Sequence, residues 1–187
     1  MRKLVVTENI TLDGVIDASE GWFEPAGDQE VDESDVIAAL REQQQAADAV
    51  LMGRLTFEQM RGYWPLQTDD ETGVTDYLNS VSKYVVSGTM KDPEWERSTV
   101  LSGELEDQVR ELKGQPGKDI VATGSITLVH ELIALDLVDE YRLFVYPVVL
   151  GRGARLFEDA RGVPRLRLVD SRAFRSGVVL LTYATEA

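Results

Sequence analysis

Residues 50–58, VLMGRLTFE, form a short apolar run that ends in a glycine turn and continues into a polar, helix-like segment. Residues 84–89 (YVVSGT) and 120–128 (IVATGSITL) repeat this arrangement. Thr56 is predicted to cap the helix after the first turn, and Ser125 or Thr127 the helix after the third. Three strands that each end in a glycine turn indicate an α/β protein with a mostly parallel sheet.

The rest of the chain extends this pattern, and we see no linker or repeat, so residues 1–187 are expected to form one domain. Apolar periodicity separates strands from helices. Residues 66–77 and 17–33 are polar and are predicted to be loops, the second of which carries Trp22 and Phe23. A Ser-Gly pair between the last two strands predicts a C-terminal antiparallel hairpin. The expected strands are 4–12, 49–52, 84–87, 99–101, 120–123, 141–150, 166–174 and 178–183, and the expected helices are 32–47, 57–62, 105–113 and 127–137.

Composition excludes several classes of function. The chain has 33 Asp and Glu against 19 Lys and Arg, a net charge of -14, which argues against nucleic acid or an anionic membrane surface as a partner. Without cysteine, and with His130 as the single histidine, we expect no metal centre and no thiol chemistry. The apolar runs are too short for a signal peptide or a membrane span, so we expect a cytoplasmic protein.

The three glycine turns predict a site for an anionic ligand. A helix N-terminus presents unpaired N–H groups and a partial positive charge, and glycine lets a phosphate approach the backbone. Ligands of open α/β sheets bind beyond the carboxyl ends of the strands. Arg54 and hydroxyl groups add donors there, although each turn is also compatible with ordinary capping chemistry. The hydroxyl groups belong to Thr56, Ser87, Ser125 and Thr127.

These residues resemble a known family. Residues 52–58 (MGRLTFE) resemble the dihydrofolate reductase segment that holds the pyrophosphate and 2′-phosphate of NADPH. Residues 11–16 (TLDGVI) are similar to a segment of the reductase domain in the riboflavin-biosynthesis deaminase/reductase. Residues 123–128, 137–140 and 146–153 are similar to the C-terminal half of that domain. The chain is therefore identified as a stand-alone member of the dihydrofolate-reductase-like family.

The resemblance implies a three-layer fold with a central, mostly parallel sheet and a C-terminal hairpin, and it implies NADPH across the strand ends. Gly53, Arg54 and Thr56 would hold the phosphates, and Ser87 would lie by the adenosine 2′-phosphate. Residues of the third turn would face the pyrophosphate and the nicotinamide; they are Gly124, Ser125, Ile126 and Thr127. Asp13 and Gly14 would border the nicotinamide and the substrate.

The first hypothesis is an NADPH-dependent reductase that acts on a C=N or C=O bond of a pterin- or pyrimidine-like ring, for example with 5-amino-6-(5-phosphoribosylamino)uracil reductase activity. Trp22, Trp64 and Tyr146 are expected to line the substrate pocket. Dihydrofolate reductase holds the pterin with one carboxylate on its first helix, and this sequence offers Asp32, Glu33 and Asp35 there. Of these, Asp32 is expected to face the core at the helix start and to take that role, although it is alternatively a helix cap. A water held by Asp13 or Asp32 would supply the proton.

The second hypothesis is a non-enzymatic protein that binds a nucleotide or flavin on the same scaffold. In either case the resemblance to the riboflavin reductase implies a homodimer, with the segment 141–153 as a possible contact.

Overall fold

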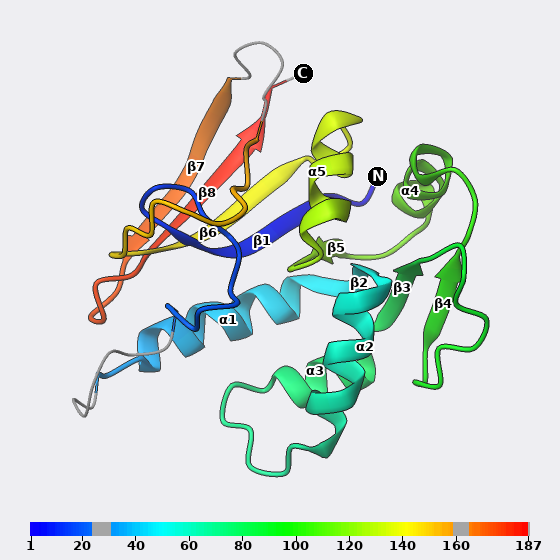
Figure 1. The fold of residues 1–187 in the computed structure, drawn as a ribbon, viewed down its shortest axis with the longest axis horizontal. Helices are drawn as coiled ribbons and strands as arrows, with labels where there is room; N and C mark the ends of the chain where they lie inside the picture. Colours follow the sequence, from blue (N-terminus) through cyan, green and yellow to red (C-terminus); the bar gives the residue numbers. More distant parts are fainter. Residues whose placement is uncertain (24–30, 159–164, 187) are drawn as a thin grey trace.

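The computed structural model describes residues 1–23, 31–158 and 165–186. An eight-stranded sheet runs through the molecule in the order β4-β3-β2-β5-β1-β6-β8-β7 (Figure 1). The strands from β4 to β6 are parallel, whereas β8 is antiparallel to β6 and β7 is antiparallel to β8. Their bounds are β1 Leu4–Thr11, β2 Ala47–Gly53, β3 Ser82–Val86, β4 Ser98–Leu101, β5 Asp119–Ala122, β6 Glu140–Tyr146, β7 Leu166–Ala173 and β8 Val179–Thr185.

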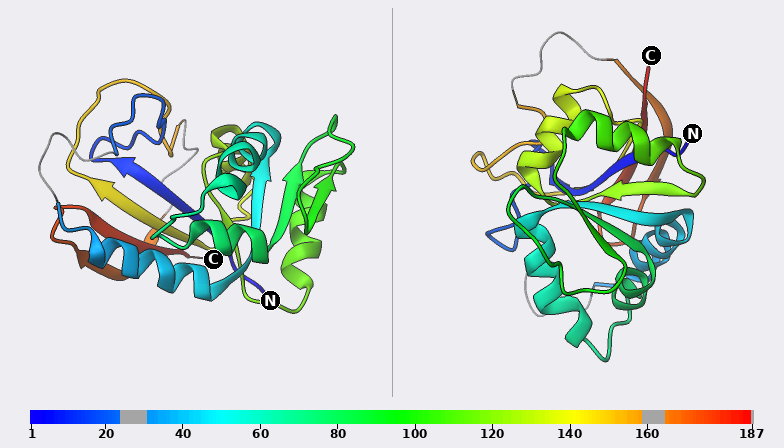
Figure 2. Two further views of the ribbon diagram at one scale, coloured as in Figure 1. Left: turned by 90° about the horizontal axis from the view of Figure 1, so that it is seen from below. Right: turned by 90° about the vertical axis from the view of Figure 1, so that its right-hand side faces the viewer.

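Helices cover both faces of this sheet, so the expected α/β architecture with a C-terminal hairpin is confirmed (Figure 2). Alternate residues of β2 point to opposite faces. Val50 packs with Phe57 and Leu78 on one face, and Leu51 with Val109 on the other. The first face carries α1 (Ser34–Ala46), α2 (Arg54–Tyr63), the 3-10 turn η1 (Trp64–Leu66) and α3 (Val74–Ser80), and the second carries α4 (Leu105–Gly114) and α5 (Ile126–Ala134).

The C-terminal hairpin extends the sheet and gives α1 a surface to pack against. Ala39 of α1 is buried in one cluster with Phe144 of β6 and Leu180 of β8. The hairpin therefore helps to hold α1 across β1 and β6, and that position makes α1 one wall of the cavity described below. Within the described residues, no helix is long and apolar enough to cross a membrane.

Several element bounds differ from the expected ones by a few residues, and two differences have a clear local cause. The segment 66–77 is only partly a loop, because α3 begins at Val74 behind Gly73, whose φ of +76° lets the chain turn into the helix. The strand expected over 141–150 ends at Tyr146. Pro147 follows immediately, and proline has no N–H to continue a strand ladder.

Candidate functional site

The first and third glycine turns lie side by side because β2 and β5 are adjacent parallel strands. Two hydrogen bonds join the turns. The backbone N–H of Gly53 donates to Ser125 Oγ at 2.9 Å, and the backbone N–H of Ser125 donates to Thr56 Oγ1 at 3.0 Å. We call Gly53, Thr56, Gly124 and Ser125 the paired turns. The structure thus brings together four of the residues that the sequence predicted to contact a phosphate-bearing cofactor.

The paired turns leave two helix N-termini next to one another. Neither α2 nor α5 has a side-chain hydrogen bond at its cap, so first-turn N–H groups of both helices remain available. The prediction that Thr56 caps α2 is wrong, since α2 begins at Arg54 and the Thr56 hydroxyl accepts from Ser125. Ser125 does occupy the N-cap position of α5.

Gly124 is fitted closely into this arrangement. Its φ is +59°, a conformation that favours glycine, and a Cβ atom there would lie 3.2 Å from Thr56 Cγ2. The turn therefore needs glycine both for its backbone angle and for the approach of Thr56. Both requirements tie the conformation of the third turn to the position of Thr56.

The other predicted cofactor residues differ in their availability. The Arg54 side chain is 44% exposed, and its guanidinium pairs with Glu58 at 3.1 Å, one turn along α2. Ser87 is buried, and its hydroxyl accepts from the backbone N–H groups of Thr89 and Met90. Both side chains thus have protein partners in this structure, but that of Arg54 lies at the surface.

Ile126 and Thr127 form the first turn of α5. Ile126 packs against the core, whereas Thr127 is exposed. Thr127 therefore presents its hydroxyl group to solvent at the same helix end as the paired turns. Ile126 adds its backbone N–H to that end rather than its side chain.

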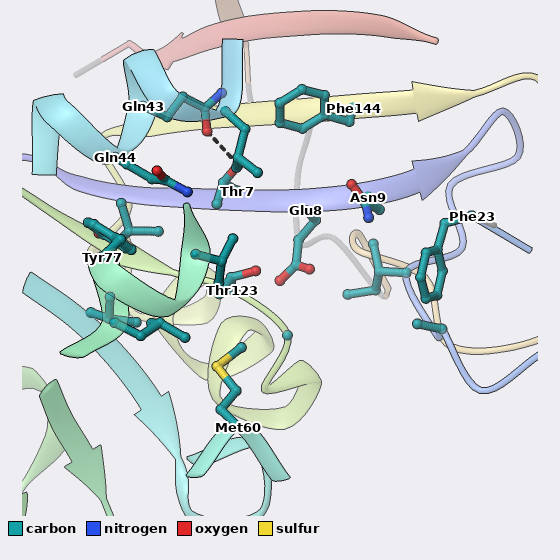
Figure 3. Close-up of a pocket in the computed structure, with 18 of the residues that line it drawn as sticks. Thr7, Glu8, Asn9, Phe23, Gln43, Gln44, Met60, Tyr77, Thr123 and Phe144 are labelled. Atoms are coloured by element: carbon teal, nitrogen blue, oxygen red, sulfur yellow. Dashed lines mark hydrogen bonds between the residues drawn. The ribbon is translucent and has the colours of Figure 1, made fainter. Parts of the chain in front are cut away.

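A cavity of about 440 Å³ adjoins the third turn on the face covered by α1, α2 and α3 (Figure 3). Apolar and aromatic side chains make most of its wall. Trp64 and Tyr146 line it, as predicted residues of a substrate pocket. The lining residues are Thr7, Glu8, Asn9, Ile16, Ala18, Phe23, Val36, Leu40, Gln43, Gln44, Val50, Met60, Trp64, Val74, Tyr77, Leu78, Val121, Thr123, Gly124, Phe144 and Tyr146.

Trp22 lies behind this wall and is not among the lining residues. Its ring contacts Tyr146 edge-on, with centroids 5.5 Å apart, and its indole N–H donates to the carbonyl of Asp17 at 2.6 Å. Trp22 thus contacts the wall residue Tyr146, and its own place in a substrate pocket stays a prediction.

Among the residues that the structure describes, Glu8 is the acidic one that lines the cavity. It lies on β1, is 6% exposed, and its Oε1 has no hydrogen-bond partner. Burial raises the pKa of its carboxyl group well above the usual value, and the backbone of Gly124 opposes this shift only in part. Sequence reasoning missed Glu8, although it alternates with the core residues Val6 and Ile10 on one strand face.

Asp13 joins two loops by hydrogen bonds, and its predicted place beside the nicotinamide stays a prediction. Its carboxylate accepts from Thr11 Oγ1 at 2.7 Å and from the backbone N–H groups of Leu150 and Gly151 at 3.2 and 2.8 Å. These hydrogen bonds lower the pKa of Asp13 to about 2. Asp13 is therefore an ionised clamp between two loops, and neither Asp13 nor Gly14 lines the cavity.

The expectation that Asp32 faces the core is wrong. Helix α1 begins at Ser34, so Asp32 precedes it, and the Asp32 side chain is 51% exposed and pairs with Arg175 in the hairpin turn. At the corresponding end of the helix, Val36 lines the cavity instead. No carboxylate of α1 reaches the cavity within the described residues.

The comparisons with known proteins agree with this architecture. The model of the RibD C-terminal domain family matches residues 2–180. An uncharacterized protein of Bacillus subtilis, YyaP, is 33% identical over 185 residues, which are 97% of this chain and 94% of that protein.

Two solved structures share the fold. A protein assigned to riboflavin biosynthesis in Shewanella sp. PV-4 has a TM-score of 0.73 at 21% identity, with 99% of both chains covered. The deaminase/5-amino-6-(5-phosphoribosylamino)uracil reductase of Thermotoga maritima has a TM-score of 0.64 at 16% identity, and the match covers 98% of this chain and 56% of that one. The fold is dihydrofolate-reductase-like, and the chain belongs to the RibD C-terminal domain family.

Proposed function

We propose that this protein is an NADPH-dependent reductase of a C=N or C=O bond in a small pterin- or pyrimidine-like ring. The observation that carries the proposal is the position of the paired turns, two joined helix N-termini, beside a cavity of ring size. Membership of the RibD C-terminal domain family and the fold shared with a uracil reductase support the same reaction class.

The residues present fit a dinucleotide. A diphosphate requires several donors in a concave site, and the uncapped first turns of α2 and α5 supply backbone N–H groups there. Gly124 would let a phosphate approach the backbone closely, because this residue has no side chain. A Cβ atom here would already contact Thr56 closely. Arg54 would hold a 2′-phosphate by exchanging its partner Glu58, a surface pair of small net energy.

A bound NADPH would supply a hydride to the ring, and the chain supplies position and surroundings. Gly124 belongs both to the paired turns and to the cavity wall, so a dinucleotide along the turns would reach the cavity at this residue. Trp64 and Tyr146 would stack on a flat ring and exclude water from it.

The decisive experiment is a fluorescence titration of the full-length protein with NADPH and with NADH. We expect binding of NADPH below millimolar concentration. Arg54→Ala should weaken NADPH binding about tenfold and leave NADH nearly unchanged, because only NADPH carries the 2′-phosphate. Failure of both nucleotides to bind would contradict the proposal, and equal losses for the two would contradict the role of Arg54.

A second candidate is a non-enzymatic nucleotide- or flavin-binding protein. It is favoured by the positions of the two predicted catalytic carboxylates, because Asp32 is surface-paired and Asp13 is an ionised loop clamp. Oxidation of NADPH in the presence of any member of a panel of pterins, pyrimidinediones and aldehydes would reject this candidate. Binding of NADPH without turnover of any member would favour it.

We further propose a homodimer, by similarity to the riboflavin reductase. The segment 141–153 contributes exposed apolar surface, including Val149, which is 67% exposed. Light scattering at micromolar concentration should give twice the mass of the chain, and a monomeric mass would refute the dimer.

A further inference from the structure

Four buried polar side-chain atoms that have no hydrogen-bond partner belong to residues of the cavity wall. They are Glu8 Oε1, Gln43 Nε2, Gln44 Nε2 and Tyr77 Oη. Buried polar atoms are rarely left unpaired, because each one costs the hydration that it lost. A group of them around one cavity therefore indicates a ligand that completes their hydrogen bonds.

Two of these side chains are directed into the open space (Figure 3). Glu8 projects from β1 beside Thr123, and the Gln44 amide nitrogen projects from α1 toward the same space. The neighbouring residue Gln43 is held by the Thr7 hydroxyl group, which lies 3.1 Å from Gln43 Oε1. The two directed side chains thus approach the cavity from different elements, at separate points of its wall.

We propose that the cavity binds an uncharged planar heterocycle with hydrogen-bond acceptors on its rim, to which Glu8, as a neutral carboxylic acid, and Gln44 donate. This inference rests on the proposed function, since it names the class of its ring substrate. The proposed ligand carries no phosphate group, unlike the substrate in the name of the Thermotoga maritima enzyme.

The described part of the cavity wall has no positively charged side chain. Among the described residues that line it, none is a lysine, arginine or histidine. A phosphate or carboxylate on the ligand would enter a mostly apolar site without a counter-ion, and burial of an unpaired charge is costly. Glu8 would add repulsion if it were ionised. The wall therefore selects for a neutral ligand.

Burial favours the protonated form of the Glu8 carboxyl group. Glu8 is buried, and no cation faces it from the described part of the wall, so its raised pKa favours the acid form, which has an O–H to donate. The other titratable groups of the described wall are the hydroxyl groups of Tyr77 and Tyr146, whose pKa values burial raises as well. All three groups are then uncharged, so the described wall presents no formal charge to a ring that has carbonyl oxygens and ring nitrogens.

The probe for this proposal is 1,3-dimethyllumazine, a fluorescent planar ring that has acceptors and no acidic N–H. Its matched anion is 1,3-dimethyllumazine-6-carboxylate. Both are titrated into the full-length protein, alone and with saturating NADP⁺. We expect the neutral ring to bind at least about tenfold more tightly than the carboxylate. Equal or tighter binding of the carboxylate, or no binding of either ring in both arms, would overturn the proposal.

Variants separate recognition by Glu8 from a structural role. Glu8→Gln keeps a neutral donor and should retain the affinity for 1,3-dimethyllumazine, whereas Glu8→Leu and Gln44→Leu should each lose about tenfold. Gln108→Leu is the matched control, because Gln108 also carries a buried unpaired atom but lies outside the cavity wall. Its ring affinity should equal that of the wild type.

A pH series adds a readout that packing alone does not produce. Wild-type affinity for the ring should fall as the pH rises through the raised pKa of Glu8, while Glu8→Gln should show no such fall. A parallel fall in both proteins would overturn the assignment to Glu8. Ring binding without NADPH binding would leave this inference intact and reject the proposed function, and the opposite result would reject the inference alone.

Discussion

The paired turns and the cavity lie next to each other, and they differ in the hydrogen bonding of their polar side chains. In the paired turns, side-chain oxygens are used up within the protein: Ser125 Oγ accepts from Gly53, and Thr56 Oγ1 accepts from Ser125. In the cavity, Glu8 and Gln44 keep atoms without partners. Under our proposals, the first region would bind its ligand with backbone groups on a fixed backbone, and the ligand of the second region would supply the missing hydrogen-bond partners. The predictions below test that difference.

The largest effect is expected from Gly124→Val. A β-branched residue at φ +59° is strained, and its Cβ atom would lie 3.2 Å from Thr56 Cγ2. NADPH affinity should fall about hundredfold, equivalent to about 3 kcal/mol, by fluorescence titration. Gly62→Val is the control, since a Cβ atom there meets nothing within 4 Å. Unchanged NADPH affinity in a folded Gly124→Val protein would show that the conformation of the third turn is not needed for NADPH binding.

Glu8→Gln should change how stability depends on pH. Burial raises the pKa of folded Glu8 well above its ordinary value, so the folded state holds a proton that the unfolded state releases. The contribution of Glu8 to stability is therefore fully present below the unfolded pKa and is lost as the pH rises toward the folded one. In this pH window, the free energy of unfolding of Glu8→Gln should rise relative to that of the wild type by up to about 1.4 kcal/mol per pH unit.

Urea unfolding of both proteins from pH 4 to pH 8 measures this difference. Glu58→Gln serves as the reference, because Glu58 is partly exposed and pairs with Arg54 at the surface. A constant difference between Glu8→Gln and the wild type across this range would contradict the assignment of a buried, protonated Glu8.

A smaller effect is expected from Thr56→Val, which keeps the shape of the side chain and removes the acceptor of the Ser125 N–H. The loss should lower the free energy of unfolding by about 1 kcal/mol, the usual net value of one hydrogen bond. Thr127→Val, on the exposed first turn of α5, should stay within about 0.5 kcal/mol of the wild type. Equal unfolding midpoints in urea for the two variants would mean that the turns are not joined as described.

The smallest effect is expected from Asp13→Asn, because the clamp lies near the surface. The pKa of Asp13 is lowered to about 2, so its stabilising effect is present above the unfolded pKa near 3.8 and is lost as the pH falls toward 2. The variant should melt below the wild type at pH 7, and the gap should narrow at pH 3. A gap that widens in acid would contradict this assignment.

The sequence predicted the positions of the strand ends better than the side-chain contacts of the site. Alternation of apolar runs and glycine turns located the strand ends around Gly53 and Gly124 correctly, because these signals are local. The partner of the Thr56 hydroxyl was missed, because Ser125 lies 69 residues away and no local rule connects them. Asp32 was chosen from its place near a helix start, where an ion pair with distant Arg175 decides its direction.

Glu8 shows what closer attention to periodicity would have found. An acidic residue at an inward position of a strand either has a buried partner or serves a site. The alternation of Val6, Glu8 and Ile10 contained this signal. What the alternation does not contain is the cavity itself, whose wall also takes residues from α1, α2 and α3.

The two hydrogen bonds of the paired turns span 72 and 69 residues, and this separation has a consequence for how the chain folds. Such contacts close late, because β2 and β5 must be paired before their ends meet. We expect substitutions in the turns to accelerate unfolding and to leave the folding rate nearly unchanged. A nascent or partly folded chain would therefore bind no dinucleotide, and the nucleotide would act as a ligand that slows the first step of unfolding.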